Sequence, residues 1–210
     1  MSIGRIIETD ACVATGAAWL AARDARMAAA LELTGPLPLR RRDDGFAELL
    51  SAIVSQQVSV ASAKAIWGRM QAAGLTLPEP IARASDDDMR AVGLSRQKIR
   101  YARALVEAGI DYKALRHVPD AEVLATLTRV SGIGPWTAEI YAMFSLGRAD
   151  VFAPGDLALQ EAARILFDLP ERPKERAFRE MAKDWSPWSS VAARLLWAYY
   201  RVAKDREGVS

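Results

Sequence analysis

Asp156 is the acidic residue of this sequence that is most clearly placed to take part in a reaction. It follows an apolar approach and a Pro-Gly turn, in the segment 151–160 (VFAPGDLALQ), and stands at the start of a predicted helix. A carboxylate placed there can stabilise positive charge on a bound molecule or take a proton from water. Aspartate also caps helix N-termini, although Leu159, at the third helical position, cannot complete a capping box. Catalysis and capping both remain open.

A glycine-containing turn at 130–138 (VSGIGPWTA) is the second segment whose residues could take part in binding or catalysis. Two predicted helices flank it, and Gly132 and Gly134 permit positive φ and the close approach of another backbone. The helix that follows presents N–H groups and the positive end of its dipole, which suits a phosphate. An ordinary corner between two helices, in which the glycines only cap a helix, fits the same pattern.

The chain has few of the reactive side chains that many other kinds of site require. There is one cysteine, Cys12, and one histidine, His117, among 210 residues. A four-cysteine iron–sulfur cluster, a cysteine or histidine zinc site and a Ser–His or Cys–His nucleophile are therefore excluded. A chain with a single cysteine forms no intramolecular disulfide, which fits a reducing compartment.

The overall charge leaves the choice of partner open. Lys and Arg number 28 against 26 Asp and Glu, a formal net charge of +2, so nucleic-acid binding would have to arise from local geometry. Arg96, Lys98 and Arg100 form one local basic cluster. They either contact a nucleic-acid backbone or form a solvated helix start.

The elements that position these segments are predicted to be helices throughout. Alanine, leucine and arginine are abundant, which favours helix, so we predict an all-α fold of about ten helices with short loops. The apolar stretch 11–22 belongs to the first of them, and no apolar run is long enough for a membrane span. The predicted helices cover residues 10–33, 46–70 with an irregularity around 55–59, 85–93, 95–108, 120–130, 136–146, 156–167, 175–184 and 188–204.

In this order and spacing, the two segments resemble the helix-hairpin-helix DNA glycosylase superfamily, and within it 3-methyladenine DNA glycosylase II. Residues 52–61 (AIVSQQVSVA) look like the helix of that family that carries a DNA wedge. Residues 185–190 (WSPWSS), followed by Trp197, look like its C-terminal helix. The resemblance covers about residues 45–200 and implies the short form without an N-terminal β domain.

The resemblance implies a role for each matching residue. Asp156 falls on the catalytic aspartate, and Gln57 on the side chain that fills the gap left by an extruded base. Trp136 and Trp197 fall on aromatic residues of the base pocket. The backbone amides that grip phosphate fall on Gly132, Gly134 and Thr137. The backbone carbonyls that hold a structural Na⁺ or K⁺ fall on Thr128, Val130 and Ile133. No other cofactor is implied.

Trp136 also indicates the type of reaction. Bifunctional relatives carry at this place a lysine that forms a Schiff base and leads to strand cleavage, and tryptophan cannot do so. The resemblance therefore implies a monofunctional glycosylase that hydrolyses the N-glycosidic bond of alkylated purines after flipping the base out of the duplex. Excision of deaminated or mismatched bases, and DNA binding without catalysis, remain as alternatives.

The resemblance further implies two helical lobes with the active site in the cleft between them. We expect a segment 1–44 that packs with the C-terminal lobe, a central lobe 45–147 with the helix-hairpin-helix at about 122–147, and a part 148–210 with the catalytic loop and the last helices. The implied partner is double-stranded DNA with damaged bases, bound by a monomer and without a membrane. The expected location is cytoplasmic, or nuclear in a eukaryote.

Overall fold

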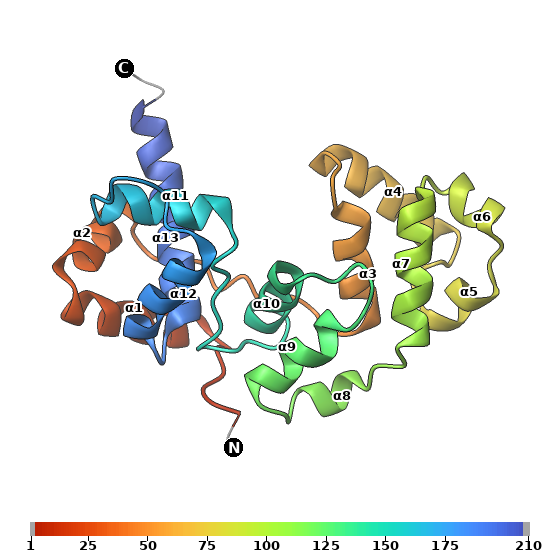
Figure 1. The fold of residues 1–210 in the computed structure, drawn as a ribbon, viewed down its shortest axis with the longest axis horizontal. Helices are drawn as coiled ribbons and strands as arrows, with labels where there is room; N and C mark the ends of the chain where they lie inside the picture. The colour runs from red at the N-terminus through yellow and green to blue at the C-terminus, as the bar shows by residue number, and fades with distance from the viewer. Residues whose placement is uncertain (1–2, 208–210) are drawn as a thin grey trace. The chain divides into compact units, whose positions relative to one another are not determined.

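The computed structural model describes residues 3–207, and within them the chain is helical (Figure 1). No strand occurs in this range; an isolated antiparallel bridge joins Ile6 and Arg148. None of the described helices is long and apolar enough to cross a membrane. The helices are α1 (Asp10–Arg23), α2 (Ala25–Thr34), α3 (Phe46–Ser55), α4 (Val60–Ala72), α5 (Pro78–Arg83), α6 (Asp86–Ala91), α7 (Arg96–Glu107), α8 (Tyr112–Leu115), α9 (Asp120–Thr128), α10 (Pro135–Phe144), α11 (Leu157–Leu166), α12 (Glu175–Ala182), the 3₁₀ helix η1 (Lys183–Trp185) and α13 (Ser189–Glu207).

The chain divides into two compact units. The terminal unit combines the described residues up to Arg41 with those from Ala142 onwards, and the central unit is Arg42–Tyr141. Helix α10 begins in the central unit and ends in the terminal one.

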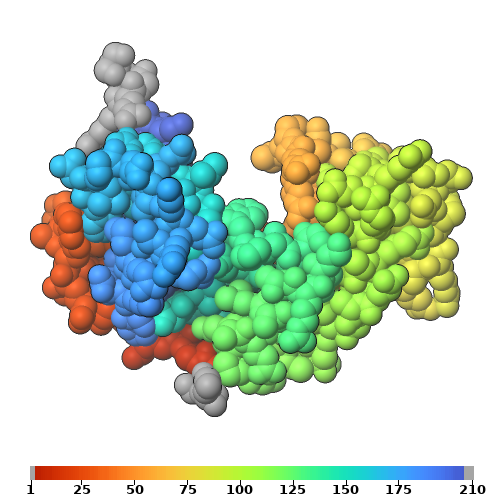
Figure 2. Space-filling view, viewed as in Figure 1, coloured from red at the N-terminus to blue at the C-terminus, as the bar shows by residue number. Residues whose placement is uncertain are grey.

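The terminal unit is built around α13, which packs against α1, α2 and α11 (Figure 1). Val191, Leu195 and Leu196 on α13 are fully buried. Helix α1 approaches α13 closely at Gly16, where a Cβ atom would lie 2.7 Å from Val191 Cγ2 and 2.8 Å from a Trp188 ring carbon. Helices α11 and α12 form much of the face of this unit seen in Figure 2.

The central unit packs around α7, which contacts α3, α5 and α6, while α4 packs on α3. Ile99, Ala102 and Leu105 recur at helical spacing and form the buried face of α7. The buried side of α3 carries Leu49 and Ile53. Helix α3 leads into the segment that contains Gln57, and α9 leads into the turn at 130–138.

Two predicted helices are each broken in the structure. The helix expected at 10–33 ends at Arg23 and restarts at Ala25, because Asp24 leaves the helical conformation and its Oδ1 accepts a hydrogen bond from the Arg26 amide at 2.8 Å. The helix expected at 46–70 is interrupted at residues 56–59, where an irregularity was predicted. There, Ser59 caps α4 by accepting from the Ser62 amide at 3.2 Å.

The estimate of about ten helices is too low, since residues 3–207 contain thirteen α-helices. Besides the break at Asp24, the prediction missed α5 and α8. These helices have six and four residues, too few for an apolar period to show in the sequence. The other predicted helices are confirmed, with boundaries that shift by a few residues.

Candidate active site

The loop before α11 holds Asp156 in one orientation. Asp156 is the N-cap of α11, and its Oδ1 accepts hydrogen bonds from the amides of Ala158 at 2.9 Å and Leu159 at 3.0 Å. The indole Nε1 of Trp197 donates to the same oxygen at 3.2 Å. The capping alternative is thus correct as geometry, and it needs no capping box. Because three donors converge on Oδ1, the carboxylate is positioned before any ligand arrives.

The approach to Asp156 is anchored in the core of the terminal unit. Phe152 is buried, and its ring makes edge contacts with Phe178 at a centroid distance of 4.9 Å and with Trp185 at 5.2 Å. Gln160 Nε2 donates to the carbonyl oxygen of Pro154 at 2.8 Å. Aromatic packing on one side and a hydrogen bond on the other therefore hold the Pro-Gly turn that presents the carboxylate.

Trp197 has two kinds of contact within the terminal unit. Besides donating to Asp156, its half-buried ring packs on Phe144 with centroids 5.8 Å apart. The guanidinium of the buried Arg194 lies over the ring of Phe144, 4.7 Å from the centroid of that ring. Arg194 also donates to the carbonyl oxygen of Leu39 at 3.0 Å, and burial lowers its pKa to about 10. A fixed stack of side chains therefore supports the tryptophan that holds the carboxylate.

The predicted hairpin is confirmed between α9 and α10. Gly132 has φ +95°, and a Cβ atom there would lie 2.3 Å from Tyr101 Cγ, so only glycine fits. The Ile133 amide donates to the carbonyl oxygen of Val130 at 3.0 Å, and the Ala138 amide to that of Gly134 at 3.1 Å. These backbone hydrogen bonds close the turn around Gly132 and begin α10 directly after it.

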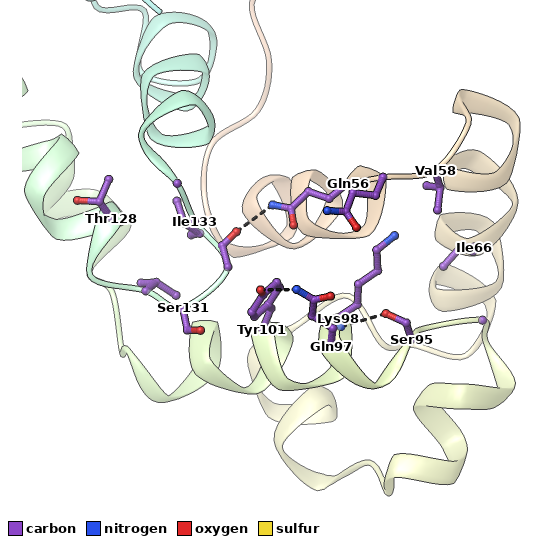
Figure 3. A pocket seen from close by; sticks show the side chains of 15 residues that line it. Gln56, Val58, Ile66, Ser95, Gln97, Lys98, Tyr101, Thr128, Ser131 and Ile133 are labelled. Atoms are coloured by element: carbon purple, nitrogen blue, oxygen red, sulfur yellow. Dashed lines mark hydrogen bonds between the residues drawn. The ribbon is translucent and has the colours of Figure 1, made fainter. Parts of the chain in front are cut away.

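A groove of about 720 Å³ in the central unit runs beside this hairpin (Figure 3). It brings together six of the residues to which the resemblance assigns phosphate, wedge or cation contacts, and Lys98 and Tyr101 of α7 also line it. The six are Gln57, Thr128, Val130, Gly132, Ile133 and Gly134. Thr137 does not line the groove and is buried in α10, whereas Trp136 is 47% exposed.

The wedge position has an unusual backbone. Gln57 is exposed and adopts a left-handed conformation, with φ +55°, between α3 and α4. For a residue other than glycine this conformation is uncommon and persists where surrounding contacts hold it. The preceding residue supplies such a contact, because Gln56 Nε2 donates to the carbonyl oxygen of Gly132 at 2.9 Å.

The three residues to which the resemblance assigns a cation meet at this groove. Thr128, Val130 and Ile133 line it together, and the Val130 carbonyl oxygen has a second lone pair besides the one that accepts from Ile133. Carbonyl oxygens suit hard cations, so the residues fit the implied Na⁺ or K⁺ site. Among the side chains that the structure describes, no group of three His, Cys, Asp or Glu could hold a metal ion.

Sequence reasoning did not find the role of Lys98. As part of a basic cluster it was expected either to contact a nucleic-acid backbone or to be solvated, but it is only 9% exposed. Its Nζ donates to the carbonyl oxygen of Val54 at 2.6 Å, and burial lowers the pKa of the ammonium group. Val54 lies far from Lys98 in the sequence, so no local pattern could have revealed this contact.

Comparisons with known proteins indicate the family to which the chain belongs. The sequence profile of the HhH-GPD superfamily base excision DNA repair proteins matches residues 50–187. The Bacillus subtilis protein YfjP is 34% identical over 124 residues, which cover 57% of this chain and 43% of YfjP. The chain thus spans less than half the length of that relative.

Two solved structures are similar over most of their length. The crystal structure of a DNA-3-methyladenine glycosidase from Bacillus halodurans superposes with a TM-score of 0.80 and 36% identity, covering 88% of each chain. A Schizosaccharomyces pombe 3-methyladenine DNA glycosylase, solved in complex with abasic DNA, superposes with a TM-score of 0.74 and 30% identity. That match covers 87% of this chain and 95% of the other.

The fold and the site together define an all-helical protein in which a hairpin suited to phosphate accompanies a preformed carboxylate at a helix N-terminus. The matched profile identifies it further: the chain belongs to the HhH-GPD superfamily of base excision DNA repair proteins.

Proposed function

We propose that this protein is a monofunctional DNA glycosylase that releases alkylated purines of the 3-methyladenine type from double-stranded DNA. The observation that carries the proposal is the orientation of Asp156, whose Oδ1 accepts from two α11 amides and from Trp197. Helix capping alone does not require the third donor. The names of the two similar solved structures support the choice of substrate.

The carboxylate suits the chemistry of this hydrolysis. When the bond between C1′ and the purine nitrogen breaks, its electron pair leaves with the base and positive charge builds on the sugar. Asp156 stabilises that charge, and water then adds to C1′ while its proton passes to the carboxylate or to solvent. The products are a free base and an abasic site. An alkylated purine already carries positive charge, so it leaves without a strong general acid.

The residue type at position 136 supports the proposal of a monofunctional reaction. Strand cleavage through a Schiff base needs an amine at the reacting carbon, whereas this chain has Trp136 at the matching position. The exposed indole of Trp136 can instead stack on a cationic base.

The central unit supplies the DNA contacts in this proposal. The hairpin amides of Gly132, Gly134 and Thr137 grip a phosphate, and Gln57 fills the space of the extruded nucleotide. A Na⁺ or K⁺ ion on the carbonyls of Thr128, Val130 and Ile133 would add positive charge beside that phosphate. The proposed partner is damaged duplex DNA, bound by one copy of the chain.

The direct test measures free bases released from methylated duplex DNA by mass spectrometry. We expect the wild-type protein to release 3-methyladenine, and Asp156→Asn to lose about 10²- to 10⁴-fold in rate. Asp168→Asn is the matched control, because Asp168 is an exposed carboxylate of the same unit, and it should retain the full rate.

The other outcomes separate the alternatives. Wild-type protein that binds DNA but releases no alkylated base would refute the proposed substrate, and release of another lesion would identify its replacement. Strand cleavage by the purified protein would contradict the monofunctional assignment. If Asp156→Asn released bases at the wild-type rate, Asp156 would be only a helix cap.

A further inference from the structure

The segment that carries the wedge is tied to the hairpin by one side chain. Gln56 immediately precedes Gln57, and its Nε2 donates to the carbonyl oxygen of Gly132 at 2.9 Å (Figure 3). Gly132 is the residue of the hairpin with positive φ. The bond therefore links the backbone next to the wedge with the turn proposed to grip phosphate, across 76 residues of sequence.

A second tie fixes the end of the helix before the wedge. The last turn of a helix has carbonyl groups without a partner inside the helix. In α3 one of these, on Val54, accepts from the buried Nζ of Lys98 at 2.6 Å. A charged donor makes a strong hydrogen bond, so α7 holds the end of α3 just before Gln56.

The same face of α7 also supports the hairpin. Tyr101 lies three residues after Lys98, one turn further along α7, and its ring occupies the space that a Gly132 side chain would need. The hydroxyl of Tyr101 accepts from Gln97 Nε2 at 2.6 Å, which fixes the ring (Figure 3). Lys98 and Tyr101 thus contact the wedge side and the hairpin side of one groove.

We propose that Gln56, Lys98 and Tyr101 are positioning residues that join the wedge segment and the hairpin into one rigid body. Gln57 then occupies a fixed place relative to the gripped phosphate, so gripping the backbone also aligns the wedge with the nucleotide gap. Without these ties, the left-handed backbone at Gln57 would relax and the wedge would lose its register with the hairpin. This inference rests on the proposed function, because it assigns Gln57 to gap filling.

The test is a double-mutant cycle on DNA affinity. The measured quantity is the ratio of affinities for a duplex with an uncleavable abasic-site analogue and for the undamaged duplex of the same sequence, since a wedge has a gap to fill only in the first. Gln56→Glu replaces the donating amide by an acceptor of the same size that repels the Gly132 carbonyl. We expect Gln56→Glu to lower the ratio about tenfold, and we expect a loss of the same size for Gln57→Ala.

The double variant decides whether Gln56 acts through Gln57. If it does, Gln56→Glu with Gln57→Ala should lower the ratio by about tenfold, like either single change, instead of the roughly hundredfold of independent effects. Gln71→Glu is the matched control on an exposed side chain of the same unit, and its ratio should stay at the wild-type value. Gln56→Asn keeps the amide but shortens its reach, so it gives the same test without a new charge if Gln56→Glu fails to fold.

Two results would overturn the inference: independent losses in the double variant, or an unchanged ratio in both Gln56 variants. The affinity ratio is measured without excision. A wild-type protein that prefers the abasic duplex but releases no base would refute the proposed reaction. The positioning role would then still be decided by the double-mutant cycle alone.

Discussion

The hydrogen bond from Trp197 to Asp156 predicts a specific kinetic defect. Trp197→Phe removes the indole N–H that donates to Asp156 Oδ1 at 3.2 Å and keeps an aromatic ring that can pack on Phe144. The variant therefore tests the hydrogen bond without emptying the space behind it.

The structure sets the size of the expected effect. A hydrogen bond to a charged group contributes roughly 1.5–3 kcal/mol. The lower end applies here, because the amides of Ala158 and Leu159 still hold the same oxygen and Trp197 is only half-buried. We expect kcat to fall by about tenfold, which corresponds to about 1.4 kcal/mol, because a mobile carboxylate must be ordered again as charge develops.

The assay is base release from methylated duplex DNA over a range of DNA concentrations. If Trp197 acts by orienting Asp156, Trp197→Phe lowers kcat and leaves KM unchanged, because the ring that could stack on a base is retained. Trp19→Phe is the control: Trp19 is a half-buried tryptophan of the same unit that packs under Arg23. A rise in KM with unchanged kcat would refute the orienting role and place Trp197 in the base pocket.

Two further predictions concern glycines at close contacts. Gly132→Ala should destabilise the protein by at least about 2 kcal/mol, because its φ is +95° and its Cβ would meet Tyr101. Urea unfolding measures the loss, and Gly134→Ala, which has open space, should change stability far less; equal losses would contradict the packing argument. Gly16→Ala should destabilise by about 1–3 kcal/mol through overpacking against Trp188. Gly68→Ala, exposed within α4 and without contacts, should instead stabilise by about 0.5–1 kcal/mol in the same measurement; a stabilising Gly16→Ala would show that α1 can move aside.

Local patterns in the sequence were sufficient to predict most of the helices and the hairpin. The start of α6 could be predicted because Ser85 and the acidic residues that follow it form a capping signal. The hairpin could be predicted from glycines between two helical patterns, and Gly132 has the positive φ that such a turn uses. In both cases the residues that determine the conformation are neighbours in the sequence.

In each unit, the contacts that hold the candidate residues join positions far apart in the sequence. The bond from Trp197 to Asp156 spans 41 residues, and that from Lys98 to Val54 spans 44. Whether a lysine is solvated or buried depends on which carbonyl the fold brings to it, and its own neighbours carry no sign of this. A local contact can also escape prediction from a helical pattern. At Asp24 a single capping residue divides the predicted helix 10–33 into α1 and α2.

Capping and catalysis at Asp156 are compatible and support one another. The first turn of α11 needs an acceptor for its amides, and the carboxylate that fills this need is thereby held in one orientation. A catalytic group that is already oriented requires little reorganisation when charge develops on the substrate. The helix cap therefore supplies the preorganisation that the proposed hydrolysis requires, and the Trp197 indole adds a restraint that the cap by itself does not need. Substitutions that disturb the start of α11 should then affect the rate of base release as well as stability, although they lie outside the set of residues that touch the base.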